Sequence, residues 1–206
     1  MLIDPYLRGN PKASVGPEDI DADVILVTHA HGDHLGDAIE IAKRNDAVIV
    51  ATFELATYCE KKGAKVLDGH FGGVISTEEC KVKIFPAIHS SSISDRLISM
   101  PSSFVVDIDS KMVYHAGDTA LFGDMSLIGE EFDLDVALLP IGGYYTMGMA
   151  DAARAQRMLK AKLVIPMHYN THDLILADPA EFERLIKRGD VGKCVILNPG
   201  EELEVP

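Results

Sequence analysis

Cysteine is scarce in this sequence, and basic residues are outnumbered by acidic ones. The chain of 206 residues has 3 cysteines, and no two of them form a Cys-x-x-Cys pair. We therefore expect neither a thiolate zinc site nor a disulfide framework. The chain has 19 Lys and Arg against 32 Asp and Glu, which gives a formal net charge of -13. Such a charge repels phosphate backbones and anionic membranes, so nucleic acid and membranes are disfavoured as partners.

Long apolar runs are also missing. No segment reaches the length of a membrane-spanning helix, and no signal-peptide pattern opens the chain, so we expect a cytoplasmic protein. Hydrophobic residues make up 47% of the sequence, which suits a globular chain rather than a disordered one. The length predicts one domain, 1–206, with a full-sized core.

The most informative stretch is Thr28-His29-Ala30-His31-Gly32-Asp33-His34. It follows an apolar run, 24–27, that is typical of a buried strand. In an extended chain His29 and His31 project to the same side, whereas Asp33 and His34 lie beyond a turn at Gly32. A single loop histidine is usually solvated or packed in a core. Four potential ligands directly after a strand are better explained by two adjacent metal ions.

Three later candidate ligands, His89, Asp118 and His168, also follow apolar strands. Taken singly, His89 reads equally well as an exposed loop residue and Asp118 as a turn former. Imidazole and carboxylate ligands suit zinc, manganese or iron, and the sequence does not choose among them.

The hydrophobic pattern predicts both strands and helices. We expect one helix after the histidine loop, with Leu35, Ala38, Ile39 and Ala42 on its apolar face. Other helices are expected from Phe53 to a stop at Gly63, from a cap at Asp151, and from Asp178 to Gly189. The strands are expected at 1–5, 24–27, 48–51, 65–67, 82–86, 103–107, 112–115, 136–141, 163–167, 195–197 and 203–205. Two sheets covered on the outside by helices would accommodate these elements.

The order His-x-His-x-Asp-His, then His, Asp and His, resembles the metallo-β-lactamase superfamily. Further motifs resemble its UPF0173 group of metal-dependent hydrolases, near the ascorbate-6-phosphate lactonases. They are Val50-Ala51-Thr52-Phe53-Glu54-Leu55-Ala56, His89-Ser90-Ser91-Ser92, Gly117-Asp118-Thr119-Ala120-Leu121-Phe122, Leu139-Pro140-Ile141-Gly142 and Pro166-Met167-His168-Tyr169-Asn170-Thr171. The resemblance runs along essentially the whole chain. It implies an α+β fold, the αββα four-layer sandwich, with a dinuclear site.

By resemblance, the first metal is held by His29, His31 and His89, and the second by Asp33, His34 and His168. Asp118 bridges the two ions, and Asp33 and Asp118 are the candidate catalytic carboxylates. A water shared by two cations, zinc first among the candidates, would ionise near neutral pH and act as the nucleophile. Asp4 resembles an aspartate that orients the histidine loop through hydrogen bonds.

The chain departs from the group in three places. The group usually begins with a further strand pair carrying a Gly-His-Ser-like motif, which is absent before Ile3-Asp4-Pro5. Either the start lies elsewhere or a hairpin is missing, and a missing hairpin would expose a sheet edge and favour a homodimer. Gly142-Gly143-Tyr144-Tyr145 replaces a Gly-Asp-x-Phe or Gly-Gly-His-Phe stretch, and His172 replaces an aromatic residue. Both of these changes concern the pocket wall.

The leading functional interpretation is a hydrolase acting on a small-molecule ester, lactone or phosphoester. By resemblance, a cyclic ester of a sugar phosphate is the most specific substrate. A phosphodiesterase or nuclease remains an alternative, weakened by the acidic charge. A metal-binding module without turnover is another, and an oxygen-reducing di-iron site is disfavoured because no flavin-binding domain is attached. His115, His70 and His172 read as packed or loop residues at least as well as site residues.

Overall fold

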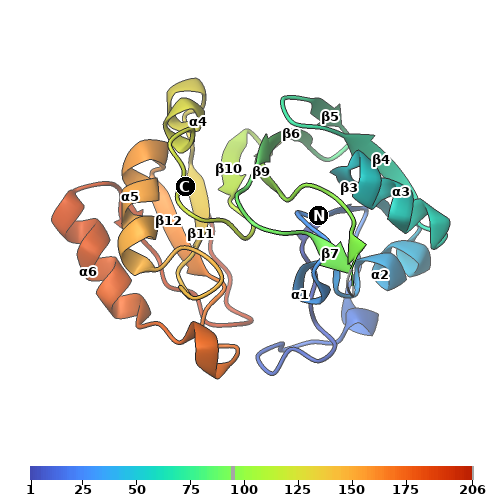
Figure 1. Cartoon of the computed structure of the whole chain (residues 1–206), viewed down its shortest axis with the longest axis horizontal. Helices are drawn as coiled ribbons and strands as arrows, with labels where there is room; N and C mark the ends of the chain where they lie inside the picture. The colour runs from blue at the N-terminus through green and yellow to red at the C-terminus, as the bar shows by residue number, and fades with distance from the viewer. Residues whose placement is uncertain (94–95, 206) are drawn as a thin grey trace. The chain divides into compact units, whose positions relative to one another are not determined.

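The computed structural model describes residues 1–93 and 96–205 (Figure 1). Contacts divide the chain into two compact units. The first unit contains residues 1–86 and 90–103, and the second contains 87–89 and the chain from Phe104 onward. The expectation of one domain stays a prediction.

The first unit is built on a parallel sheet of four strands. Its order is β1 (Leu2–Ile3), β2 (Val24–Leu26), β3 (Val48–Thr52) and β4 (Lys65–Gly69). All three pairings are parallel, with Leu2 opposite Ile25 and Val24 opposite Val48. The central strands β2 and β3 are apolar without alternation because both of their faces are buried, as is usual in parallel sheets. All four strands were expected from the sequence.

The helix predicted after the histidine loop is divided in two. Helix α1 spans Gly32–Leu35, and α2 spans Ala38–Asn45. Between them Gly36 has a φ of +40°, and a Cβ there would lie 2.4 Å from the Pro5 carbonyl oxygen. The prediction of one helix was wrong because the N-terminal segment passes too close at this point for any residue other than glycine.

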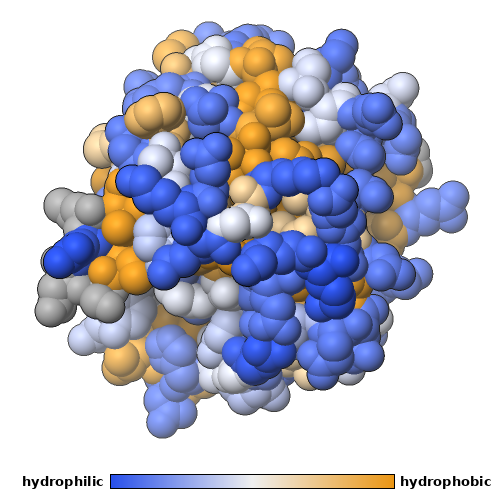
Figure 2. Space-filling model, turned by 90° about the vertical axis from the view of Figure 1, so that its right-hand side faces the viewer, coloured by the Kyte–Doolittle hydropathy of each residue, from blue (hydrophilic) through white to orange (hydrophobic). Residues whose placement is uncertain are grey.

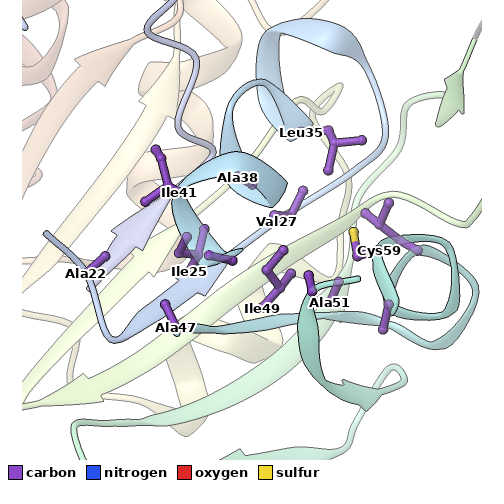
Figure 3. Packing of buried hydrophobic residues seen from close by; sticks show 14 of the residues in the cluster. Ala22, Ile25, Val27, Leu35, Ala38, Ile41, Ala47, Ile49, Ala51 and Cys59 are labelled. Atoms are coloured by element: carbon purple, nitrogen blue, oxygen red, sulfur yellow. The ribbon is translucent and has the colours of Figure 1, made fainter. Parts of the chain in front are cut away.

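Helices α2 and α3 (Phe53–Lys61) supply much of the core of the first unit. Figure 3 shows Ile25 and Val27 from the β2 segment beside Ile49 and Ala51 of β3, with Ala38 and Ile41 of α2 packed over them. Cys59 of α3 belongs to the same cluster. Gly63, with a φ of +90°, follows the end of α3 as expected.

Two antiparallel strand pairs complete the described elements of this unit, with the short 3-10 turn at Pro17–Asp19. β5 (Val74–Ser76) pairs with β6 (Lys81–Pro86), and β7 (Ser92–Ile93) pairs with β8 (Arg96–Leu97). Along β6 the burial alternates, with Val82 and Ile84 inward, which confirms the half-buried strand predicted there. Figure 2 shows a mostly hydrophilic face with an apolar area in its upper part.

The second unit contains a mixed sheet. The strands that this unit contributes to it are β9 (Ser102–Ile108, which begins in the first unit), β10 (Lys111–His115), β11 (Val136–Pro140), β12 (Leu163–Met167) and β13 (Lys193–Cys194). β9 and β10 form the predicted antiparallel hairpin, and β10 to β13 pair in parallel. Asp109 and Ser110 turn the hairpin with φ values of +50° and +62°, the left-handed conformation that two-residue hairpin turns require.

Three helices cover this sheet. They are α4 (Met125–Glu131), α5 (Met149–Leu159) and α6 (Pro179–Gly189), and α5 contacts both of the others (Figure 1). Asp178 caps α6 by accepting a hydrogen bond from the Ala180 N–H, as predicted. Asp151 is not a cap, because α5 begins two residues earlier, after Gly148. It lies in the first turn of α5, where a carboxylate also suits the helix dipole.

The C-terminal strand predictions were wrong. The last strand is β13, Lys193–Cys194, and neither 195–197 nor 203–205 is a strand. Val195 donates one backbone hydrogen bond to the Val164 carbonyl, after which the chain turns at residues 199–200. The apolar residues of this tail have the alternating pattern of a strand, but backbone hydrogen bonding to β12 stops at Val195.

The three cysteines are buried and form no disulfide, as expected. Burial raises the pKa of Cys59 to about 12 and, with a contribution from Glu183, that of Cys194 to about 12. Both thiols are therefore protonated at neutral pH and unsuited to nucleophilic chemistry. Among the described residues, no helix has the length and apolar character needed to span a membrane.

Helix α4 approaches α5 closely at Gly129, which gives a test of the fold. A Cβ at Gly129 would lie 2.1 Å from the Met158 carbonyl oxygen. Replacing a helical Gly by Ala normally stabilises a helix by about 1 kcal/mol. We expect Gly129→Ala to do the opposite and destabilise the protein by about 1–3 kcal/mol, because backbone must move. Urea unfolding measures the difference.

Gly123→Ala is the matched control, since a Cβ there meets nothing within 4 Å. An unfolding free energy for Gly129→Ala equal to or above that of the native chain would contradict the close approach of the two helices.

Candidate metal centre

The candidate ligands fall into two sets, one in each unit. His29, His31, Asp33 and His34 belong to the first unit, and His89, Asp118 and His168 belong to the second. Along the chain, each candidate ligand or group of ligands follows a strand. The first set follows β2, and the second set follows β6, β10 and β12. Strand ends fix the backbone while leaving the loop side chains available for chemistry.

In the first unit a single carboxylate organises the histidine loop. Asp4 has a φ of +47° and lies directly after β1. Its Oδ1 accepts a hydrogen bond from the Thr28 N–H at 2.7 Å, and its Oδ2 accepts one from the Thr28 hydroxyl at 2.6 Å. The same Oδ2 lies 2.8 Å from Nδ1 of His34. Asp4 therefore holds the strand end and the short helix α1 together.

These contacts set the tautomers of two histidines. The Thr28 hydroxyl has one proton, and the shortest contact gives that proton to Asp4. His29 Nδ1, 3.0 Å from the same hydroxyl oxygen, is then the donor to it, and His34 Nδ1 donates to Asp4. In both rings the lone pair is left on Nε2, the arrangement commonly found in histidines that bind metals.

His31 completes this group. Its Nδ1 lies 3.0 Å from Nε2 of His29, and its Nε2 lies 3.3 Å from the Ser90 hydroxyl. The loop backbone is held as well, because the Ala30 N–H donates to the buried hydroxyl of Ser91 at 3.0 Å. Asp33, in α1, has a side chain 48% exposed, with Oδ2 3.8 Å from Nε2 of His34.

In the second unit Asp118 lies between two histidines. Its Oδ2 is 3.5 Å from Nε2 of His89 and 3.3 Å from Nε2 of His168. The Asp118 side chain is 4% exposed. Such a buried carboxylate is costly unless cationic or donor groups compensate for it. The oxygen lies from both imidazole nitrogens at the spacing that is usual between two ligands of one metal ion.

Thr119 connects the loops that bear these ligands. Its hydroxyl accepts a hydrogen bond from the Ile88 N–H at 3.0 Å, next to His89. Its carbonyl accepts one from the Met147 N–H at 2.9 Å. His115 is buried, and its Nδ1 accepts from the Gly117 N–H at 3.2 Å, which supports the turn into Asp118. It supports the site rather than lining it.

His168 takes a φ of +54° and Asn170 one of +60°, uncommon for residues other than glycine. The Asn170 amide stabilises this loop by bonding both the N–H and the carbonyl of Ala177, at 2.9 and 3.0 Å. Beside it, burial raises the pKa of Tyr169, and the Cys194 thiol acts in the same direction. The Tyr169 phenol is therefore protonated at neutral pH and can only donate or accept a hydrogen bond.

The residues present fit metal ions. Ligands about 2.1 Å from one ion are roughly 3.0–3.5 Å apart, and His29 Nε2 and His31 Nδ1 are 3.0 Å apart. The pairs around Asp118 meet the same criterion. Nitrogen and carboxylate donors suit zinc, iron or manganese.

The sequence indicated the candidate ligands and Asp4 but not the residues that support them. Thr28, Ser91 and Thr119 are each fully buried, yet hydroxyl residues in loops carry no pattern that distinguishes such a role. His70 is exposed, and its Nδ1 accepts from the Phe71 N–H. The loop residue His172 lies against Tyr145, with ring centroids 6.4 Å apart.

Comparison with known proteins places this geometry in a family. Residues 1–169 match the model of the Beta-lactamase superfamily domain. The chain is 52% identical over 207 residues to a UPF0173 metal-dependent hydrolase of Thermococcus kodakarensis, covering 100% of this chain and 92% of that protein. It is 47% identical over 210 residues to one from Pelotomaculum thermopropionicum, with the same coverage.

Among solved structures, a metallo hydrolase from Ignicoccus hospitalis superposes with a TM-score of 0.89 at 38% identity, covering 97% of this chain and 88% of that one. The metallo-β-lactamase fold protein YhfI of Bacillus subtilis superposes with a TM-score of 0.69 at 14% identity, over 91% of this chain and 79% of that one, and so shows the fold alone. The predicted α+β metallo-β-lactamase fold is confirmed.

The role of Asp4 can be tested by Asp4→Asn. An asparagine keeps the shape, but its NH₂ group would face the donors of Thr28 or His34 and disturb the tautomer of His34. We expect metal affinity to fall about 10–100-fold, as for other groups that orient metal ligands. Competition with a chelator, followed by elemental analysis, measures the loss.

Asp46→Asn is the control, because Asp46 also has a positive φ but pairs with exposed Lys65. Equal metal affinity in both variants would show that Asp4 does not orient the ligands.

Proposed function

Because this chain belongs to the metallo-β-lactamase superfamily and to its UPF0173 group of metal-dependent hydrolases, we propose that it hydrolyses a small ester, lactone or phosphoester with two divalent cations bound. The proposal of two metal ions rests mainly on the position of Asp118. One buried oxygen of this carboxylate faces two imidazole nitrogens at 3.3 and 3.5 Å, as a ligand shared by two ions would.

The proposed ligand sets follow the order of the motifs along the chain. His29, His31 and His89 hold one cation, and Asp33, His34 and His168 hold the other. Asp118 is common to both. This assignment unites residues of the two units, and it rests on the sequence order and on the arrangement within each unit. Zinc is the first candidate for both ions, with manganese and iron as alternatives.

When bound, the two cations supply Lewis acidity, which makes water a better nucleophile near neutral pH and polarises the scissile bond. The chain supplies orientation. Asp4 fixes the ring of His34 directly and that of His29 through the Thr28 hydroxyl, and Asp118 is fixed between its two histidines. Asp33, whose side chain is 48% exposed, is the carboxylate placed to exchange a proton with solvent or product.

Two other functions compete with this one. A phosphodiesterase acting on nucleic acid would need a surface that attracts phosphates, and the formal charge of -13 opposes that. A metal-binding module without turnover would bind the same ions. Such a module would differ from the proposed hydrolase only because it cleaves no substrate, so a screen for hydrolytic activity distinguishes the two functions.

The test begins with metal content. We expect two ions per chain by elemental analysis after reconstitution with zinc or manganese, and hydrolysis within a panel of esters, lactones and phosphoesters. His31→Ala should remove mainly one ion and His168→Ala mainly the other. Asp118→Asn should lower metal content and rate together, because a neutral amide is a poor bridge between two cations.

His70→Ala is the matched control, since His70 is exposed and lies outside the ligand sets. A reproducible content of one ion or fewer would refute the dinuclear site. Two ions with no turnover of any ester, lactone or phosphoester would favour the binding module.

We also propose self-association into a homodimer through the N-terminal segment. β1 is only two residues long and is an edge strand of its sheet, next to β2. A strand in that position offers backbone groups to a second copy of the chain. Light scattering after size-exclusion chromatography is expected to give twice the mass of 22.4 kDa. A monomer across the micromolar range would exclude the dimer.

A further inference from the structure

Large apolar side chains are unevenly distributed over the surface of the second unit. Among its described residues, those that are exposed are Ile88, Leu127, Tyr144, Tyr145, Leu174 and Leu176. All of them except Leu127, which lies on α4, belong to loops that either bear a ligand or are bonded to one that does. We call the remaining five the apolar rim. Exposing large apolar side chains to water is unfavourable in free energy, so their concentration on one set of loops indicates that a ligand binds there.

The rim is tied to the ligand loops by main-chain hydrogen bonds. Ile88 precedes His89, and its N–H and carbonyl bond to the Thr119 hydroxyl and the Ala120 N–H, both at 3.0 Å. Residues 141–148, which we call the tyrosine loop because they include Tyr144 and Tyr145, are anchored by the bond from the Met147 N–H to the Thr119 carbonyl. Thr119 directly follows Asp118, so the rim is positioned relative to Asp118.

The tyrosines are presented in a defined way. Tyr144 is 73% exposed, with a φ of +33°. A non-glycine residue in this region is strained and must be held by its surroundings. The loop supplies that restraint through the bonds Gly143 N–H to Met147 O and Thr146 N–H to Gly143 O. The rings of Tyr144 and Tyr145 meet edge to face at 4.7 Å between centroids, and Tyr145 continues to His172.

The last part of the rim lies beyond His168. The side-chain amide of Asn170 closes the loop onto Ala177, and the Asn170 N–H bonds to the carbonyl of buried Ile175. Leu174 and Leu176, on either side of Ile175, are left 51% and 66% exposed.

Charge limits what these loops can bind. The ligand-bearing stretches 28–37, 87–89, 116–124 and 168–178, and the tyrosine loop 141–148, contain no Lys and no Arg. A phosphate remote from the scissile bond is most often recognised by such a cation. An uncharged substrate with an apolar group needs only surface of the kind that the rim presents.

We propose that the apolar rim selects the substrate, and that the substrate is an uncharged carboxylic ester or lactone with an aromatic or extended apolar substituent. This inference rests on the proposed hydrolase function. Tyr144 and Tyr145 are its principal specificity-determining residues and bind the substituent through their ring faces. The bond that is cleaved lies at the metal centre.

Three lactones test the selection with the metal-loaded protein: γ-phenyl-γ-butyrolactone, unsubstituted γ-butyrolactone, and 6-phosphogluconolactone. We expect kcat/KM to be highest for the phenyl compound, at least about tenfold above γ-butyrolactone, with most of the difference in KM. Tyr144→Ala combined with Tyr145→Ala should remove that advantage, whereas the two Phe replacements should keep it. Leu127→Ala, an exposed residue outside the rim, is the control.

A binding measurement separates failure of the inference from failure of the hydrolase proposal. The lactam 5-phenyl-2-pyrrolidinone resists hydrolysis, and saturation-transfer NMR should detect its contact with the native protein and a clear loss in the double Ala variant. If no lactone or ester is cleaved but this contact behaves as expected, the hydrolase proposal fails and the rim remains a binding surface for apolar groups.

Three results would overturn the inference. One is a preference for 6-phosphogluconolactone. Another is an unchanged preference for the phenyl compound, or unchanged lactam contact, in the double Ala variant. The third is conversion of an oligomer to monomers by the double Ala variant without any change in selectivity, which would make the rim an interface between copies of the chain.

Discussion

The contact of the Asp4 carboxylate with Thr28 and His34 is the interaction on which the first ligand set depends. Each oxygen accepts from a donor fixed by another element, at 2.6–2.8 Å. The carboxylate cannot move without releasing both the end of β2 and the helix α1. Since it also determines which ring nitrogen carries a proton, a residue that follows the neighbouring strand β1 sets the tautomers of His29 and His34.

The sequence was informative where the chemistry is concentrated. His29, His31, Asp33 and His34 lie within six residues, and Asp4 was recognised by its resemblance to an orienting aspartate. The apolar runs of β2, β3 and β11 also predicted their strands correctly, because strands buried on both faces have no competing pattern. The structure brings His89, Asp118 and His168 together within the second unit, which single-residue reasoning had left open.

What the sequence could not predict depends on close approaches and local competition. The break between α1 and α2 depends on the distance from Gly36 to Pro5, which are far apart in sequence. The tail at 203–205 has a strand-like pattern but no described strand to pair with. The supports Thr28, Ser91 and Thr119 were missed because a buried hydroxyl is recognisable only from its partners.

The attachment of the tyrosine loop has an evolutionary consequence. Met147 is bonded to Thr119 through main-chain atoms, and the bonds that join Gly143 to Met147 and to Thr146 are also between backbone groups. Their formation does not depend on which side chains stand at 144 and 145. Mutations there can alter the loop's outer face while Asp118 stays where it is, so related chains are able to diversify in what they recognise while inheriting the same reaction centre unchanged.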